Sequence, residues 1–134
     1  MLIRDLMSSP AVTISWASSV EHAASVLRSR GFTALPVIDE DGHLVGIVSE
    51  ADVLDGRVPA DPRRRGPSAP GRPGRPGGTV ADVMTTPVES LTPGADAADA
   101  AEIMLDEGIR CLPVVDGHAV VGVITRRDLL GAIS

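Results

Sequence analysis

Residues 46–54 read GIVSEADVL, and residues 122–130 read GVITRRDLL. Each copy holds a glycine, a short apolar run, a hydroxyl residue, two variable positions, an aspartate and two apolar residues. The apolar run predicts a buried strand, and the hydroxyl residue predicts the start of a helix. The aspartate in the first turn of that helix has two interpretations: it caps the helix, or it holds a ribose while the helix start attracts a phosphate.

The two copies belong to a longer tandem repeat. Residues 3–54 align with residues 80–130 at an offset of 77 positions, which becomes 76 after one deletion in the turn that follows Asp116. Identical pairs in this order, with a single gap, indicate an internal duplication. The pairs are Asp5/Asp82, Met7/Met84, Pro10/Pro87, Ala23/Ala100, Ala24/Ala101, Gly31/Gly108, Leu35/Leu112, Pro36/Pro113, Val37/Val114, Asp39/Asp116, Val45/Val121, Gly46/Gly122, Asp52/Asp128 and Leu54/Leu130.

Each repeat predicts the element order β-α-β-β-α. An extended piece (12–14; 88–91) precedes an amphipathic helix with apolar residues at helical spacing (20, 23, 24 and 27; 97, 100, 101 and 104). Ser18 and Glu21 match a capping box, and Gly31 and Gly108 match left-handed C-caps. Two strands (35–38 and 44–48; 112–115 and 120–124) lead to a last helix that opens at Ser49 or Thr125.

One repeat of about 50 residues buries too little surface to be stable alone. We therefore expect an α+β fold in which the two repeats pack as one pseudo-twofold domain with a cleft between them. The apolar pairs 53–54 and 129–130 are expected at the junction. We expect the chain to divide into repeat 1 (residues 1–55), a linker (56–79) and repeat 2 (80–134).

The linker differs in composition from both repeats. It is rich in proline and glycine, which predicts disorder. Residues 57–78 carry six arginines and one acid, a net charge of +5. Because the whole chain has a net charge of -6, the rest of the chain carries -11. An acidic body disfavours nucleic-acid binding, and a basic linker leaves polyanion binding as a lesser alternative.

Other function classes find little support in the sequence. There is no run of 18 apolar residues and no signal-peptide pattern at the start, which predicts no membrane span. A single cysteine, Cys111, suits the reducing cytoplasm and is expected to be buried. The histidines His22, His43 and His118 lack ligand spacing, and no catalytic set converges, so neither a metal site nor an enzyme is predicted.

With both repeats aligned, the chain resembles a pair of CBS (cystathionine beta-synthase) domains, also called a Bateman module. The resemblance covers the chain outside the linker. The residues that carry it are 5–10 (DLMSSP) with 82–87 (DVMTTP), 35–39 (LPVID) with 112–116 (LPVVD), and 46–54 (GIVSEADVL) with 122–130 (GVITRRDLL).

The resemblance implies a regulatory module that binds an adenosine ligand such as AMP, ATP or S-adenosylmethionine in the cleft, with no other cofactor. It also implies a homodimer, a disc of four repeats, and a regulated partner protein. By family position, Ser49 and Thr125 contact phosphate, while Asp52 and Asp128 hold ribose. The base lies against Ile47 or Val123 and against the segment before the other repeat's Leu-Pro, which is Phe32–Thr33 or Ile109–Arg110.

The two expected sites differ in charge. Repeat 2 has Arg126 and Arg127 between hydroxyl and aspartate, whereas repeat 1 has Glu50 and Ala51 there. Arginine forks suit phosphate oxygens, so the Asp128 site is expected to bind phosphate better. Arg110 is expected in the site that carries Asp52. The alternative function, from a different class, is a structural module that dimerises or docks without a ligand.

Overall fold

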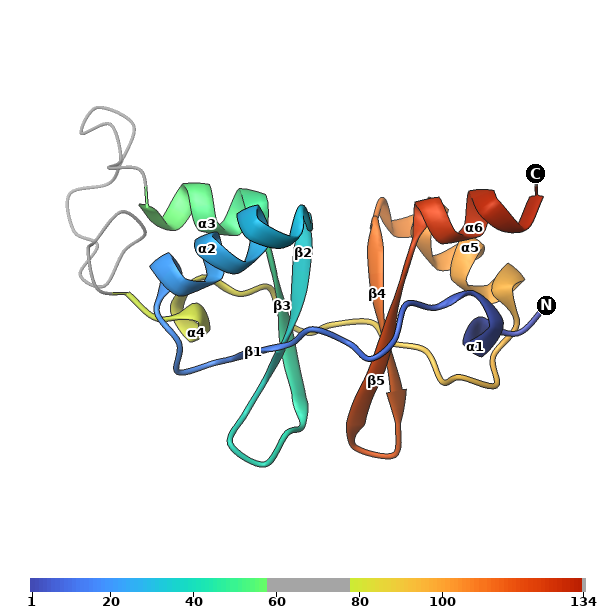
Figure 1. The fold of residues 1–134 in the computed structure, drawn as a ribbon, viewed down its shortest axis with the longest axis horizontal. Coiled ribbons are helices and arrows are strands. Elements are labelled where there is room, and N and C mark those ends of the chain that lie inside the picture. The colour runs from blue at the N-terminus through green and yellow to red at the C-terminus, as the bar shows by residue number, and fades with distance from the viewer. Residues whose placement is uncertain (58–77, 134) are drawn as a thin grey trace.

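The computed structural model describes residues 1–57 and 78–133, arranged as two similar halves side by side (Figure 1). The α+β repeat predicted from the sequence is confirmed, with hairpins in the middle of the molecule and helices packed on them. The elements are α1 (Ile3–Leu6), β1 (Ile14–Ser15), α2 (Val20–Arg30), β2 (Ala34–Ile38), β3 (Leu44–Ser49), α3 (Glu50–Arg57), α4 (Val80–Val83), α5 (Ala97–Glu107), β4 (Cys111–Asp116), β5 (Ala119–Thr125) and α6 (Arg126–Ile133).

The ends of the long helices follow from local chemistry. Gly31 and Gly108 close α2 and α5 at φ 68° and 66°, which confirms both predicted left-handed caps. The predicted start of α2 is wrong by one residue, because Ser19 rather than Ser18 is the N-cap. The Ser19 hydroxyl accepts a hydrogen bond from the His22 N–H at 3.0 Å.

Each half contains one antiparallel hairpin. Strand β2 pairs with β3, with Leu35 opposite Val48, and β4 pairs with β5, with Leu112 opposite Ile124. Strand β1 adds to β2 in parallel, whereas in the second half the equivalent contact is a single parallel bridge from Leu91 to Val114. The Leu-Pro-Val motifs therefore form the buried strand of each half.

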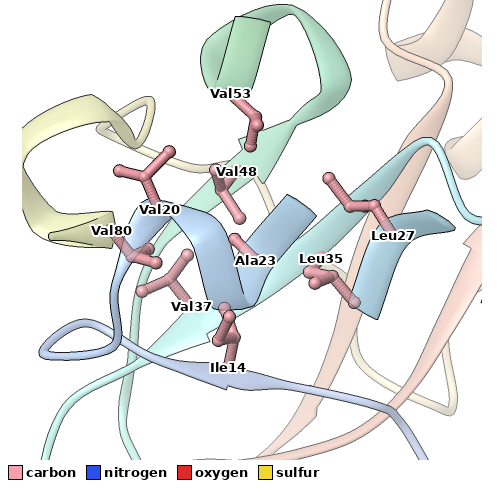
Figure 2. Packing of buried hydrophobic residues seen from close by; sticks show 9 residues of the cluster. All are labelled: Ile14, Val20, Ala23, Leu27, Leu35, Val37, Val48, Val53 and Val80. Atoms are coloured by element: carbon pink, nitrogen blue, oxygen red, sulfur yellow. The ribbon is translucent and has the colours of Figure 1, made fainter. Parts of the chain in front are cut away.

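The first helix of each sequence repeat packs in the opposite half. Figure 1 shows α1 beside α5 and α6, and α4 beside α2 and α3, with the connecting segments crossing between the halves. Ile3 is fully buried in the second core, and its N–H donates to the Ala95 carbonyl at 2.8 Å. Val80 is fully buried in the first core, where it lies among Val20 and Val37 (Figure 2).

This exchange was not predicted, and neither were α1 and α4. The bounds 1–55 and 80–134 describe sequence repeats, while each packing unit takes residues from both. Most of the predicted linker lies outside the described residues. Of its ends, Arg57 closes α3, and the Gly78 carbonyl accepts a hydrogen bond from the Val20 N–H at 3.0 Å.

Gly46 and Gly122 have no side chain because the exchanged segments pass directly over them. A Cβ on Gly122 would lie 2.8 Å from the Ser8 carbonyl oxygen and 2.8 Å from the Met7 sulfur. A Cβ on Gly46 would meet the Met84 sulfur at 2.8 Å. The close approach of the crossing chain thus explains why the sequence has glycine at positions 46 and 122.

The last helices do not place their apolar pairs at the junction as expected. Val53 is buried in the first core, together with residues of that half and Val80. Leu54 and Leu130 are instead 61% and 64% exposed. In the part of the chain that the structure describes, no helix is long and apolar enough to cross a membrane.

Candidate functional site

Each strand-to-helix junction forms a reciprocal cap. The Thr125 N–H and hydroxyl donate to Asp128 Oδ2 at 2.9 and 3.1 Å, and the Asp128 N–H donates to Thr125 Oγ1 at 3.3 Å. At the other junction the Ser49 N–H donates to Asp52 Oδ2 at 2.9 Å, and the Asp52 N–H donates to Ser49 Oγ at 3.2 Å. The capping interpretation of both aspartates is therefore confirmed.

The two aspartates differ in which of their carboxylate oxygens already accept a hydrogen bond. Both oxygens of Asp52 accept a hydrogen bond from the Thr85 hydroxyl, at 3.2 and 3.3 Å. Within the described residues, Asp128 Oδ1 accepts no hydrogen bond. Capping thus uses one oxygen of Asp128 and leaves the other available, whereas Asp52 is already engaged by the crossing segment.

The crossing segments bring each repeat to the other's junction. Ser8 pairs with Val123, with reciprocal N–H to carbonyl distances of 2.9 and 3.0 Å. Thr85 pairs with Ile47 in the same way, at 2.8 and 3.1 Å. Any pocket at a junction is therefore bordered by residues of both sequence repeats.

A cavity of about 470 Å³ lies beside Asp128. Repeat 2 contributes the junction, and repeat 1 contributes the crossing segment and the turn between α2 and β2. The cavity is lined by Ser8, Pro10, Val12, Arg30, Gly31, Phe32, Thr33, Ala34, Pro36, Arg110, Cys111, Val123, Thr125, Arg126, Arg127 and Asp128.

The structure brings together part of the predicted site. Val123, Thr125, Arg126, Asp128, Phe32, Thr33 and Arg110 line the cavity. Ile47, Ser49, Asp52 and Ile109 do not, because the first three belong to the other junction and Ile109 packs against the second core. The association of Phe32 and Thr33 with Val123 is the arrangement expected for one mixed site.

Arg110 lines the Asp128 cavity, whereas the sequence predicted it in the site that carries Asp52; its place in that second site stays a prediction. It lines the Asp128 cavity because β4 and β5 pair with Cys111 opposite Thr125. The same register continues past the strands, where the Arg126 N–H donates to the Arg110 carbonyl at 3.3 Å. Residue 110 thus lies at the start of α6, next to the arginines of that helix.

Sequence reasoning missed several lining residues. Arg30 lies in the last turn of α2, where a basic residue complements the helix dipole, so the sequence offered no reason to single it out. Ser8, Pro10 and Val12 were missed because the exchange of first segments was not predicted.

Cys111 is buried, as predicted, and lines the cavity. Burial raises the pKa of its thiol to about 11, and the nearby Asp128 carboxylate adds to the rise. The thiol is therefore protonated near neutral pH and contributes a small apolar surface to the cavity wall.

The histidines are less scattered than the sequence indicated. The rings of His43 and His118, in the turns of the two hairpins, have centroids 4.4 Å apart. No group of three or more His, Cys, Asp or Glu side chains that could hold a metal occurs among the described residues.

Comparison with known proteins gives the same family for both halves. The model of the CBS domain family matches residues 3–58 and 80–134. The uncharacterized protein MJ1404 of Methanocaldococcus jannaschii is 32% identical over 133 residues, which cover 98% of this chain and 32% of that protein. An A-adding tRNA nucleotidyltransferase of Aquifex aeolicus is 31% identical over 98% of this chain but only 14% of its own length. The chain thus spans a third or less of these two relatives.

Solved structures match over all or nearly all of the chain. The CBS domain pair of protein MJ0100, in complex with 5'-methylthioadenosine and S-adenosyl-L-methionine, is 27% identical with a TM-score of 0.79, covering 100% of this chain and 98% of that one. CBSX2 in complex with AMP is 27% identical with a TM-score of 0.78, covering 98% and 95%.

Proposed function

This chain belongs to the CBS domain family, and from that premise we propose that it is a regulatory module that binds an adenine nucleotide in the cavity beside Asp128. The observation that carries the proposal is the free Oδ1 atom of Asp128 at a cavity of about 470 Å³. A carboxylate oxygen pairs well with ribose hydroxyls. Support also comes from MJ0100 and CBSX2, whose structures hold adenosine-containing ligands.

The proposed pose divides the cavity by chemistry. The ribose lies at Asp128, and the phosphate lies at the N-terminus of α6, where Arg126 offers a guanidinium and the Thr125 hydroxyl exchanges its hydrogen bond to Asp128 for one to phosphate. The base lies against the apolar wall formed by Val123 and Phe32. Phe32 is 38% exposed, which leaves ring surface for a ligand to cover.

The site around Asp52 is proposed as the weaker one. Thr85 occupies both oxygens of Asp52, so a ribose there has to displace an existing hydrogen bond. Ile47, Ser49 and Ile109 stay candidates for contacts at that site.

Thermal-shift titration with AMP, ATP and S-adenosylmethionine tests the function. A ligand at about 100 times its Kd stabilises a protein by about 2.7 kcal/mol, which raises the melting temperature measurably. Asp128→Ala should weaken binding more than Asp52→Ala. Because each change also removes a cap worth about 1 kcal/mol, Asp128→Asn serves as the control that keeps an acceptor for the Thr125 N–H.

Two outcomes would contradict this proposal. Equal effects of the two aspartate variants would remove the preference for the Asp128 site. No stabilisation by any adenosine ligand at millimolar concentration would favour the alternative, a structural module that dimerises or docks without a ligand. The polyanion alternative concerns the basic segment 57–78, which lies outside the described residues except for Arg57 and Gly78.

Regulation needs a partner that distinguishes two states of the module. We propose a cytoplasmic homodimer with no catalytic activity of its own, which transmits ligand binding to a partner protein. Support for association comes from exposed apolar side chains on the helices, with Leu54, Leu105 and Leu130 exposed by 61%, 78% and 64%. Light scattering coupled to size-exclusion chromatography should give twice the monomer mass, and a monomer would contradict the dimer.

A further inference from the structure

Four described arginines line the Asp128 cavity. Arg30 comes from the end of α2, Arg110 from the residue before β4, and Arg126 and Arg127 from the first turn of α6. Among the described residues that line the cavity, Asp128 carries the one carboxylate. The formal charge of this lining is therefore +3, in a chain whose net charge is -6.

Among the described residues, these guanidinium groups have no acidic partners. Across residues 1–57 and 78–133, no salt bridge is formed to any of the four. Arg126 is positioned by a neutral contact, a hydrogen bond from its Nε to the Ile109 carbonyl at 3.3 Å. Each of the four groups thus keeps donors available for an anion in the cavity.

The positions equivalent to these arginines in the other repeat show that the fold does not require them. The 77-residue offset relates Arg30 to Glu107 and Arg110 to Thr33, and the 76-residue offset relates Arg126 to Glu50. Glu107 ends α5 where an acid opposes the helix dipole, so basic residues are not needed to close this helix. The charge of the Asp128 cavity is a property of this one site.

We propose that the Asp128 site selects nucleoside polyphosphates over monophosphates and over cationic adenosine ligands. This inference rests on the proposed nucleotide function and names the ligand class within it. An arginine fork binds two phosphate oxygens, so one terminal phosphate is satisfied by about two forks. Four forks from three separate elements match a chain of two or three phosphates.

Cationic ligands are excluded by the same charges. S-adenosylmethionine carries a sulfonium, an ammonium and a carboxylate, so its net charge is positive, and its two cationic groups would lie among groups of like charge. The opposite junction has Glu50 and Asp52 in the first turn of α3 and repels polyphosphate. A stoichiometry of one polyphosphate per chain follows.

Isothermal titration with AMP, ADP, ATP and S-adenosylmethionine, with EDTA present and at constant ionic strength, tests the inference. The expected order of affinity is ATP, ADP, AMP, with at least about tenfold between ATP and AMP because additional charge-assisted hydrogen bonds form. Equal affinities for ATP and AMP, or tighter binding of S-adenosylmethionine, would overturn the inference and leave the nucleotide function standing. Binding of none of the four would remove both.

Arg30→Ala isolates the contribution of the charge that sequence reasoning missed. It should weaken ATP binding by about tenfold and AMP binding by clearly less, because a monophosphate is bound mainly near α6. Arg28→Ala is the matched control, since Arg28 is an exposed arginine in the same helical turn that does not line the cavity. A similar loss of ATP affinity in both variants, or no loss in either, would refute the role of Arg30.

Discussion

Ile3→Ala tests whether α1 stabilises the half of the molecule that contains repeat 2. The Ile3 side chain is fully buried among the second core, which includes Leu112, Val114 and Ile124. Removing its three outer carbons loses about 2.4 kcal/mol of transfer free energy at about 0.8 kcal/mol per group. The hydrogen bond from the Ile3 N–H to Ala95 holds the backbone in place, so a cavity remains and raises the loss to about 3 kcal/mol.

Urea denaturation measures the total loss, and amide hydrogen exchange shows where it occurs. Protection should fall in β4 and β5, far from residue 3 in sequence, and less in β2 and β3. Val80→Ala is the matched variant, because Val80 is equally buried in the first core and should lower protection in β2 and β3. A greater loss in β2 and β3 for Ile3→Ala, or equal losses in both sheets, would refute the assignment of each first helix to the opposite half.

Gly122→Ala should lower the free energy of unfolding, measured in urea, by more than Gly46→Ala does. The new Cβ at residue 122 would lie 2.8 Å from a backbone carbonyl oxygen, whereas the new Cβ at residue 46 first meets the flexible side chain of a methionine. A larger effect at Gly46 would contradict this reasoning. Cys111, with a thiol pKa of about 11, should react with a disulfide reagent at pH 8 about a hundredfold more slowly than the unfolded chain, and an equal rate would show an accessible thiolate. Folding raises the pKa of the Cys111 thiol from 9.0, so the stability associated with the neutral thiol is fully present below pH 9 and is lost as pH rises toward 11. In denaturation curves measured over this range, Cys111→Ala should reduce the fall in the free energy of unfolding with pH.

Much of the architecture could be predicted because it depends on local signals. The strands carry continuous apolar runs, and Gly31 and Gly108 end their helices where a positive φ is required. The four-residue helices α1 and α4 are too short to show a helical period. The exchange had no local signal at all, since Ile3 and Val80 hold equivalent positions in the two repeats and would suit either core.

The site could be predicted only in part. The junction of Thr125 and Asp128 repeats a recognisable motif, and its hydrogen bonds are those of the predicted cap. Arg30 joins the cavity through tertiary packing alone. The place of Arg110 in the Asp128 cavity was missed because it depends on the register of β4 and β5, which the sequence pattern leaves open.

The crossing of the chain also bears on how such a molecule could arise and be taken apart. A cut between residues 58 and 77 would give two fragments, each lacking the helix that completes its own core. Neither fragment should fold well alone, yet the two should reassemble when mixed, by fragment complementation. A single-repeat ancestor would have met the same need by exchanging its first segment with a second copy. Duplication and fusion of its gene would then have joined an existing dimer into one chain.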